Sequence, residues 1–402
     1  MLLAGGPADA WLQWGGPTRN FQAAPVPLAD AWPADGPRVV WKRDLGVGFS
    51  SIVTDGRTLY TLFKRDKETV VIALDAASGK TVWEQAVDAE PNAAEAKEMD
   101  LQHGLGPGST PLISGDKLFA VTFMGRLLAL DRATGRIVWS QELIRRLGGT
   151  IVSYGYANSP IADEDKIILP VGGKGHALMA FRMRDGSVAW QSGDSDNANS
   201  SPIHAKLLGE DQIIVQLQDE LMAVNPATGA ILWRHPHREK SDIEASDPVV
   251  VSGDTLIAAS LNIGAREIQL KRENGKITAT EVWTAPKMRV MHGNMLRIGD
   301  CLYASNGGGF GPTPLAAMRI SDGAIAWQER KFLKSALLGV GDKTIILEED
   351  GRLLLATLSP EGMKTLAEAE VLSEPAWTPP TLVGTRLYLR DTKSIVALDF
   401  SR

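Results

Sequence analysis

Polar, charged and aromatic side chains that could bind a ligand recur just before a set of short apolar segments. They combine aromatic faces, both signs of charge and amide groups, which together can orient a polar planar ligand or a peptide. The same side chains could instead satisfy backbone groups and water in ordinary loops, and this alternative stays open. The candidate ligand-binding residues are His103, Tyr156, Asn158, Asn199, Glu244, Arg289, His292, Asn294, Lys334 and Trp377.

Patterns typical of catalysis or metal binding are weak. His235 and His237 flank a proline, as in a surface loop. Residues 194–199 carry two aspartates but lack the glycine and the distant glutamate that a calcium loop needs. The glycine-rich residues 306–311 open no helix, so they are not expected to bind phosphate. We therefore predict no catalytic residue and no metal site.

Seven tryptophans close copies of one short sequence, and these copies indicate the elements that position the candidate residues. The clearest copies run from Ala73 to Trp83 and from Ala129 to Trp139. A period of about 40 to 55 residues with four short apolar runs per unit is typical of a β-propeller. The closing tryptophans, which we expect to pack across the boundary between neighbouring blades, are Trp41, Trp83, Trp139, Trp190, Trp233, Trp283 and Trp327.

The turn inside each copy has a local physical basis. Asp75, Asp131 and Asn225 can accept hydrogen bonds from backbone amides ahead of them, as Asp185 can in its own copy. A glycine four residues before the tryptophan can take the positive φ that closes a tight hairpin. The small alanine that opens the copy leaves space for the indole. The fifth and seventh repeats depart from the pattern, so we expect their blades to be the least tightly held.

The starts of the inner strands provide an independent count of blades. Eight such starts are found, near residues 50, 109, 159, 201, 247, 293, 335 and 378. The last repeat ends without an outer strand, while an unused strand with a tryptophan lies at residues 39–41. We predict an all-β, eight-bladed β-propeller of four-stranded antiparallel blades, closed by the N-terminal strand completing the C-terminal blade.

These repeats resemble the tryptophan-docking repeats of the pyrroloquinoline-quinone (PQQ) type eight-bladed propellers, and the resemblance covers residues 11–402. The opening residues 11–20 also look like the start of bacterial PQQ-like repeat proteins. The family includes quinoprotein dehydrogenases and scaffold proteins similar to BamB of the outer-membrane β-barrel assembly machinery. The resemblance therefore implies either a PQQ-dependent enzyme of alcohols or sugars or a non-catalytic binding protein.

The dehydrogenase alternative would need PQQ with calcium. The resemblance implies that the quinone stacks on a tryptophan and on a disulfide of adjacent cysteines, with calcium held by Glu and Asn and with an Asp as base. Trp377, Glu244 and Asp247 could take the stacking, metal and base roles. The lone Cys301 cannot form that disulfide. We therefore expect a scaffold without a cofactor.

Charge and targeting signals bear on partners and compartment. The net charge is −6 and no basic stripe is present, so nucleic acid is not expected as a partner. No segment approaches the roughly 20 apolar residues of a membrane span. Residues 1–10 end in Ala8, Asp9 and Ala10 and are interpreted as the remnant of an export signal, with residues 11–402 as a single propeller. We expect a periplasmic or cell-surface protein that binds a protein or glycan of the cell envelope.

Overall fold

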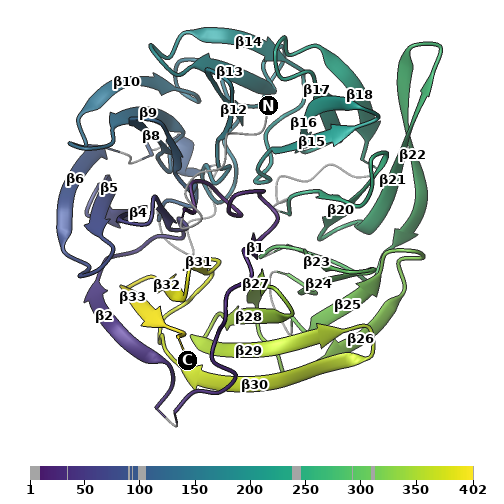
Figure 1. Ribbon diagram of the computed structural model, residues 1–402. Coiled ribbons are helices and arrows are strands. Elements are labelled where there is room, and N and C mark those ends of the chain that lie inside the picture. The colour runs from purple at the N-terminus through teal and green to yellow at the C-terminus, as the bar shows by residue number, and fades with distance from the viewer. Residues whose placement is uncertain are drawn as a thin grey trace.

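Short apolar runs bounded by Gly, Asp and Ser form strands throughout the chain, and each group of four strands builds one antiparallel sheet. The computed structural model describes residues 10–33, 35–88, 91–92, 94–97, 106–237, 246–291, 293–308 and 313–401. In this part of the chain, eight such sheets, or blades, surround a central axis (Figure 1). The predicted eight-bladed propeller is therefore confirmed.

The first four blades follow one another in chain order, each from its inner strand to its outer strand. Blade 1 contains β3 (Val53–Thr54), β4 (Thr58–Arg65), β5 (Glu68–Asp75) and β6 (Thr81–Asp88); blade 2 contains β7 (Leu112–Ser114), β8 (Lys117–Val121), β9 (Arg126–Asp131) and β10 (Ile137–Glu142); blade 3 contains β11 (Ile161–Asp163), β12 (Lys166–Pro170), β13 (Leu178–Arg182) and β14 (Val188–Ser192); blade 4 contains β15 (Ile203–Leu207), β16 (Glu210–Gln216), β17 (Glu220–Val224) and β18 (Ile231–Pro236).

The remaining blades continue the order until the ring closes. Blade 5 contains β19 (Val249–Val250), β20 (Thr255–Ser260), β21 (Gly264–Glu273) and β22 (Lys276–Ala285); blade 6 contains β23 (Leu296–Ile298), β24 (Cys301–Ser305), β25 (Leu315–Arg319) and β26 (Ile325–Glu329); blade 7 contains β27 (Ser335–Val340), β28 (Lys343–Glu348), β29 (Arg352–Ser359) and β30 (Gly362–Glu370); blade 8 contains β31 (Thr381–Val383), β32 (Arg386–Arg390), β33 (Ser394–Asp399) and β2 (Arg38–Asp44). A short strand, β1 (Gln22–Ala23), joins blade 7, and a 3-10 helix, η1 (Glu95–Lys97), precedes blade 2.

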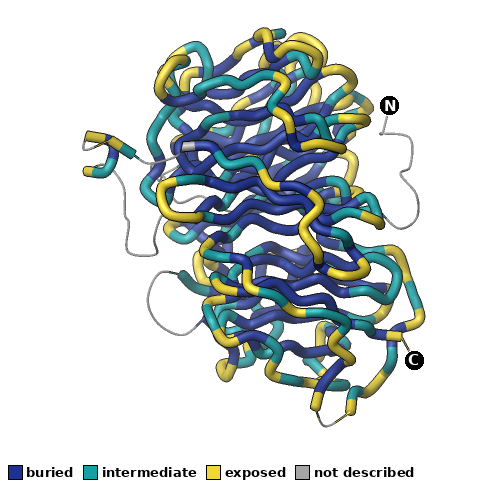
Figure 2. The backbone as a smooth tube through the Cα atoms, turned by 90° about the vertical axis from the view of Figure 1, so that its left-hand side faces the viewer, coloured by how far each residue is buried: buried dark blue, intermediate teal, exposed yellow. Residues whose placement is uncertain are grey.

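The hydrophobic core lies between blades rather than inside one. Val53 and Tyr60 of blade 1 share one buried cluster with Ile113 and Leu118 of blade 2. The middle strands are therefore buried on both faces, as the continuous apolar run of β9 requires. In the side view, the buried strands form a layer between exposed turns (Figure 2). No blade could bury both of its faces without its two neighbours.

The ring closes through the N-terminal strand, as predicted. β2 pairs antiparallel with β33, so that Trp41 lies opposite Ala397. The exposed Arg38 forms an ion pair with the buried carboxylate of Asp399. On the other side of the junction, the Trp41 indole donates to the Ala76 carbonyl of blade 1 at 3.0 Å.

A buried arginine holds blade 8 against blade 1. The Arg390 guanidinium, at the end of β32, is fully buried. It donates to the carbonyls of Leu62 at 2.6 Å and Gly46 at 3.1 Å, and to the hydroxyl of Thr61 at 3.0 Å. Burial lowers the pKa of Arg390 to about 9, so the group remains charged at neutral pH. One cation therefore satisfies several buried acceptors at the closure.

Five repeat tryptophans lie directly on a glycine of the next blade. A Cβ placed on Gly135 would lie 2.5 Å from Cε3 of Trp83, and its φ of +75° already favours glycine. The same contact joins Gly79 to Trp41, Gly186 to Trp139, Gly229 to Trp190 and Gly323 to Trp283. The glycine predicted for the hairpin is therefore also required by the indole of the preceding blade.

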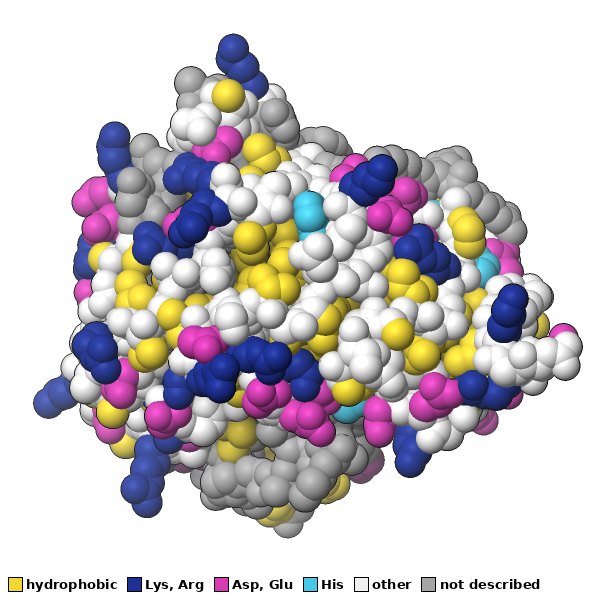
Figure 3. Space-filling model, turned by 90° about the horizontal axis from the view of Figure 1, so that it is seen from above, with side chains coloured by type: hydrophobic (Ala, Val, Ile, Leu, Met, Phe, Trp, Pro, Cys, Tyr) yellow, Lys and Arg dark blue, Asp and Glu magenta, His cyan; other side chains and the backbone are white. Residues whose placement is uncertain are grey.

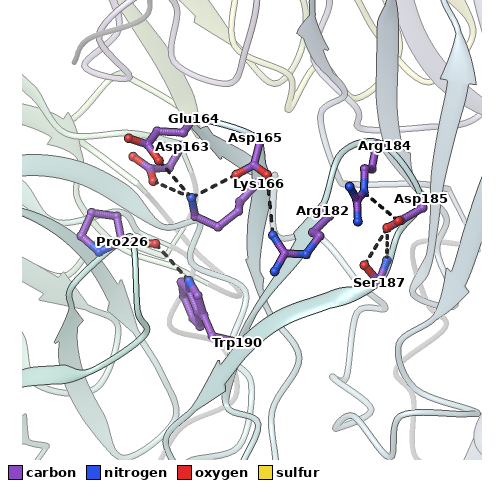
Figure 4. A network of polar contacts seen from close by, with 10 residues as sticks. All are labelled: Asp163, Glu164, Asp165, Lys166, Arg182, Arg184, Asp185, Ser187, Trp190 and Pro226. Atoms are coloured by element: carbon purple, nitrogen blue, oxygen red, sulfur yellow. Dashed lines mark hydrogen bonds and ion pairs between the residues drawn. The ribbon is translucent and has the colours of Figure 1, made fainter.

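The indole nitrogens add polar bonds between blades. Trp83 donates to the Arg132 carbonyl at 3.0 Å and Trp190 to the Pro226 carbonyl at 3.0 Å. Figure 4 shows the Trp190 indole directed at Pro226, and it also shows Asp185 accepting from Ser187 in the hairpin of blade 3. Equivalent bonds run from Trp41 to Ala76, from Trp139 to Met183 and from Trp327 to Ser359.

Every outer strand of the described chain contains a register shift beside the tryptophan position. In blade 1, Trp83 pairs with Ala73 while Thr81 pairs with Leu74, so Val82 is the extra residue. A bulge of this kind redirects the side chains that follow it and increases the local twist. Small residues lie opposite the indoles of six blades, namely Ala73, Ala129, Ala180, Ala223, Ala317 and Ala397.

The hairpin of the fifth repeat makes a contact that the repeat pattern did not predict. This hairpin of β21 and β22 is elongated and packs against blade 4, where Leu270 is buried in the same cluster as Trp233. Trp233 is only 3% exposed and donates to Gln212 of its own blade at 2.7 Å. The long hairpin therefore covers an indole that has no glycine turn above it.

We predict that Gly135→Ala destabilises the fold more than Gly209→Ala does. Both glycines have positive φ, but a Cβ on Gly209 would meet nothing within 4 Å. Gly209→Ala should lower the free energy of unfolding by about 1–2 kcal/mol through backbone strain alone. Gly135→Ala should lose roughly 1–3 kcal/mol more, because its methyl group collides with Trp83. Urea denaturation checks this, and equal losses for the two variants would contradict the indole contact.

We also predict that Arg390→Met weakens the closure by about 3 kcal/mol or more, because several buried acceptors lose their donor. The free energy of unfolding of Arg390→Lys should lie between that of Arg390→Met and that of the natural chain, since an ammonium group has fewer donors than a guanidinium group. The exposed Arg146 provides the control, and Arg146→Met should stay within about 0.5 kcal/mol. Unfolding free energies measure all three, and a fully stable Arg390→Met protein would show that the closure does not depend on this cation.

Candidate functional site

The opening residues 11–23 lie inside the ring, where Figure 1 shows them running to β1 near the centre. Trp11 exchanges two backbone hydrogen bonds of 2.8 Å with Thr54 of blade 1. The Leu12 carbonyl accepts from the Ile113 amide of blade 2 at 2.8 Å, and β1 pairs in parallel with β27 of blade 7. The segment therefore covers the inner edges of blades 1, 2 and 7.

Arg19 extends this segment to blade 3. Its guanidinium is buried and donates to the carbonyls of Pro160 at 3.1 Å and Ser159 at 3.3 Å. Burial lowers the pKa of Arg19 to about 10, and the negative charge of Asp247 opposes this shift. Arg19 therefore stays charged at neutral pH inside the propeller.

A chain of side-chain acceptors links the inner strands of five blades at the entrance, the face where these strands begin. The Ser51 amide donates to the Thr110 hydroxyl at 3.1 Å, and the Thr110 amide donates to the Ser159 hydroxyl at 3.0 Å. The Ser159 amide donates to the Ser201 hydroxyl at 2.9 Å, and the Ser201 amide donates to Asp247 at 2.7 Å. Each blade is thus held by a residue at the same position of the next blade.

Asp247 is the last member of this hydrogen-bonded series, and its carboxylate has two oxygens that can accept. One of its oxygens accepts from the Ser201 amide, and the other accepts from the Trp14 indole at 2.6 Å. A carboxylate has two separate acceptor oxygens, so each donor bonds its own oxygen. Burial raises the pKa of the Asp247 carboxyl, while Arg19 and the bond from Trp14 oppose the shift. Asp247 therefore joins the opening segment to the linked blades.

Three of the predicted binding residues are structural. Asn158 is fully buried and donates to the carbonyls of Ala198 at 2.7 Å and Ser200 at 2.6 Å. Asn294 exchanges two hydrogen bonds with the Leu337 backbone. Tyr156 lies in the core of blades 2 and 3, where burial raises its pKa well above the ordinary value. These three side chains therefore make contacts inside the protein.

Two other predicted residues meet on the entrance face. Trp377 stacks on Phe49 with a ring distance of 5.3 Å, and its indole donates to Glu349 at 2.8 Å. The Lys334 ammonium lies 4.9 Å from the centre of the Trp377 ring and 3.4 Å from the Glu349 carboxylate. This arrangement combines a cation–π contact with an ion pair and fixes the orientation of the indole.

The remaining predicted residues lie apart or cannot be placed. Arg289 is exposed and donates to the Pro286 carbonyl, and Asn199 is half-buried. His103, Glu244 and His292 lie outside the described residues. Within the described ranges, no three His, Cys, Asp or Glu side chains are grouped as metal ligands, and no helix is long and apolar enough to cross a membrane.

Of the three residues that the resemblance assigns to a quinone site, Trp377 and Asp247 make internal contacts, and Glu244 lies outside the described residues. Trp377 is bonded to Glu349, Asp247 is bonded to Trp14 and Ser201, and Cys301 is buried and free. These internal contacts weigh against a quinone held by Trp377 and Asp247, so no catalytic step is derived from them.

Sequence reasoning missed the roles of Trp14, Arg19 and the hydroxyl series. The recurrence of a Ser, Thr or Asp at the inner-strand starts was used only to count blades, although the same recurrence marks the interblade bonds. Trp11 and Trp14 lie outside the repeat register, which is a signal that they serve another purpose.

We predict that Trp14→Phe destabilises the protein by about 1.5–3 kcal/mol, because Asp247 loses a hydrogen bond from the indole. Trp32→Phe is the matched control, since the Trp32 indole nitrogen has no hydrogen-bond acceptor among the described residues. Trp32→Phe should lower the free energy of unfolding by less than about 1 kcal/mol. Denaturation curves compare the two variants, and equal losses would rule out a special contribution of the bond to Asp247.

Comparisons with known proteins agree with this fold. The family model described as "Outer membrane protein assembly factor BamB" matches residues 31–99 and 92–329. Outer membrane protein assembly factor BamB of Burkholderia pseudomallei is 23% identical over 272 residues, which are 59% of this chain and 69% of that protein. Quinohemoprotein alcohol dehydrogenase ADH IIB of Pseudomonas putida is 28% identical over 190 residues, or 45% of this chain and 26% of that protein.

A solved structure extends the likeness over almost the whole chain. Quinohemoprotein alcohol dehydrogenase from Comamonas testosteroni superimposes with a TM-score of 0.68 and 14% identity, covering 98% of this chain and 81% of that chain. At this identity the likeness shows the fold alone. The family model, in contrast, matches well over half of the sequence, including the repeats that form blades 1 to 6. This chain therefore belongs to the PQQ-like eight-bladed propeller family whose model is described as outer membrane protein assembly factor BamB.

Proposed function

We propose that this protein is a non-catalytic binding or scaffold propeller of the bacterial cell envelope, which engages a protein partner through its entrance face. The observation that carries the proposal is the internal use of the candidate side chains. Asn158 and Asn294 tie blades together, and Asp247 holds Trp14. The chain's own opening segment lies along the channel. Side chains held in this way support a rigid disc better than they support a reacting substrate.

A docking patch on the entrance face consists of Val47, Phe49, Leu333, Lys334 and Trp377. Val47 is 38% exposed and Leu333 is 39% exposed. Phe49 and Trp377 stack on each other, and Lys334 lies against the indole. Aromatic anchors are enriched at protein interfaces. A protein partner is therefore favoured over a glycan.

The surface charge is consistent with a protein partner rather than nucleic acid. Figure 3 shows one edge of the ring, on which basic and acidic side chains are interspersed. Ion pairs such as Arg234–Glu220 at 3.3 Å and Arg182–Asp165 at 3.7 Å join opposite charges of the propeller. Export to the periplasm or cell surface, with residues 1–10 as a signal remnant and residues 11–402 as one propeller, is part of the same proposal.

A PQQ-dependent dehydrogenase is the second candidate function. It is favoured by the similarity to quinohemoprotein alcohol dehydrogenase ADH IIB, although the matched stretch spans only 26% of that enzyme. That activity would require PQQ with calcium. The internal contacts of Trp377 and Asp247 make it the weaker candidate.

The docking proposal predicts a site-specific cross-link. A photo-reactive benzoylphenylalanine at Leu333 should capture a defined envelope protein in cells, because the side chain lies in the docking patch. Benzoylphenylalanine at Val282, which is 54% exposed on an outer strand, should not capture this envelope protein. Trp377→Ala should reduce the Leu333 cross-link at least severalfold without unfolding the protein. Equal cross-linking at both positions would contradict the assigned face.

A second assay separates the two candidate functions. Purified protein incubated with PQQ and calcium should show no saturable quinone absorbance and should reduce no artificial electron acceptor with alcohols or sugars. Saturable PQQ binding together with dye reduction would instead establish the dehydrogenase.

A further inference from the structure

A cavity of about 370 Å³ lies between the opening segment and blades 4, 5 and 6. The backbone pairs of the opening segment are made with blades 1, 2 and 7, and Arg19 bonds blade 3. The inner strands β15, β19 and β23 line the cavity instead. The volume lies within the roughly 300–1,000 Å³ of small-ligand sites, near the lower end.

The lining of this cavity is cationic although the whole chain is acidic. Arg19, Lys206 and Arg297 contribute three positive charges, and Asp247 contributes one negative charge. The Arg297 guanidinium donates to the carbonyls of Val250 and Val251, as Arg19 does to those of blade 3. Among the described residues, no carboxylate lies within 4.0 Å of these three cations. His204 also lines the cavity, 3.7 Å from the Asp211 carboxylate.

The other walls are aromatic and aliphatic. Trp14 and Phe21 meet edge to face, with ring centres 5.1 Å apart and an angle of 88° between planes. Ile203, Val249 and Met295 complete the apolar lining. Because Asp247 orients the indole of Trp14, this wall is fixed in the folded protein. The cavity thus pairs a rigid apolar surface with excess positive charge.

We propose that this cavity binds a carboxylate joined to a flat apolar group, with the carboxylate near Lys206 and Arg297 and the apolar group against Trp14 and Phe21. Two sources share this chemistry, namely the C-terminal residue of a peptide and a free aromatic acid. Lys206 and Asn20 are exposed at the rim, so both sources have access. This inference goes beyond the proposed docking at the entrance and does not depend on it.

The test uses the full chain and two pairs of probes. Each pair consists of an acid and the amide of the same shape. 3-Phenylpropionate is compared with its amide, and the tripeptide Ala-Ala-Phe with a free C-terminus is compared with the C-terminal amide. Isothermal titration calorimetry measures the affinity of each probe. At least one acid should bind at least 10-fold more tightly than its amide. Binding of the free acid alone identifies a small-molecule site, and binding of the tripeptide identifies a peptide terminus.

A charge reversal at the rim makes the test specific. Lys206→Glu should weaken binding of the acid at least 10-fold, while Lys80→Glu, at an exposed position of a blade 1 hairpin, should leave it unchanged. Circular dichroism verifies that both variants fold. The proposal is overturned if no acid binds up to about 10 mM, if acids and amides bind equally, or if Lys206→Glu has no effect.

Discussion

Burial of both faces of every blade depends on closure of the ring. A blade in this chain has apolar residues on both sides of its middle strands, so each sheet is stable only between two neighbours. The closure brings residues more than 300 positions apart into contact, such as Arg390 with the Leu62 carbonyl. The single buried cation and the β2–β33 pairing at this junction therefore stabilise all eight interfaces at once.

The interblade contacts occur at two distances from the central axis of the propeller. On the outside, indoles cover the glycine turns of the next blade, and a bulge in each outer strand directs the residue at the tryptophan position. At the centre, backbone amides donate to hydroxyl groups of the next inner strand. Where they occur, both contacts use the same position of each blade, which is why they appear in the sequence as a repeat. Where the outer contact is altered, as at Trp233, an elongated hairpin replaces it.

The centre of the propeller is shaped by a segment outside the repeats. Residues 11–23 cover the inner edges of three blades and leave blades 4 to 6 beside a cavity. Asp247 belongs both to the hydroxyl series and to this segment, because its two oxygens accept from Ser201 and Trp14. A position that is purely structural in other blades thus becomes part of a cavity wall. The lining of this cavity does not include Trp377, which is held on the entrance face by Glu349 and Lys334.

The sequence by itself determined the number of blades, the hairpin turns and the strand that closes the ring, because these depend on a local period and on residues such as Asp131 and Gly135. It also located the polar residues at the inner-strand starts, but it could not assign their roles. Tyr156, Asn158 and Asn294 are predictable as polar loop residues, yet only the tertiary structure decided that they contact neighbouring blades. The positions of Trp14 and Arg19 were likewise decided by contacts 233 and 141 residues away in the sequence, respectively. Such long-range contacts leave no periodic pattern, so no reading of the repeat could supply them.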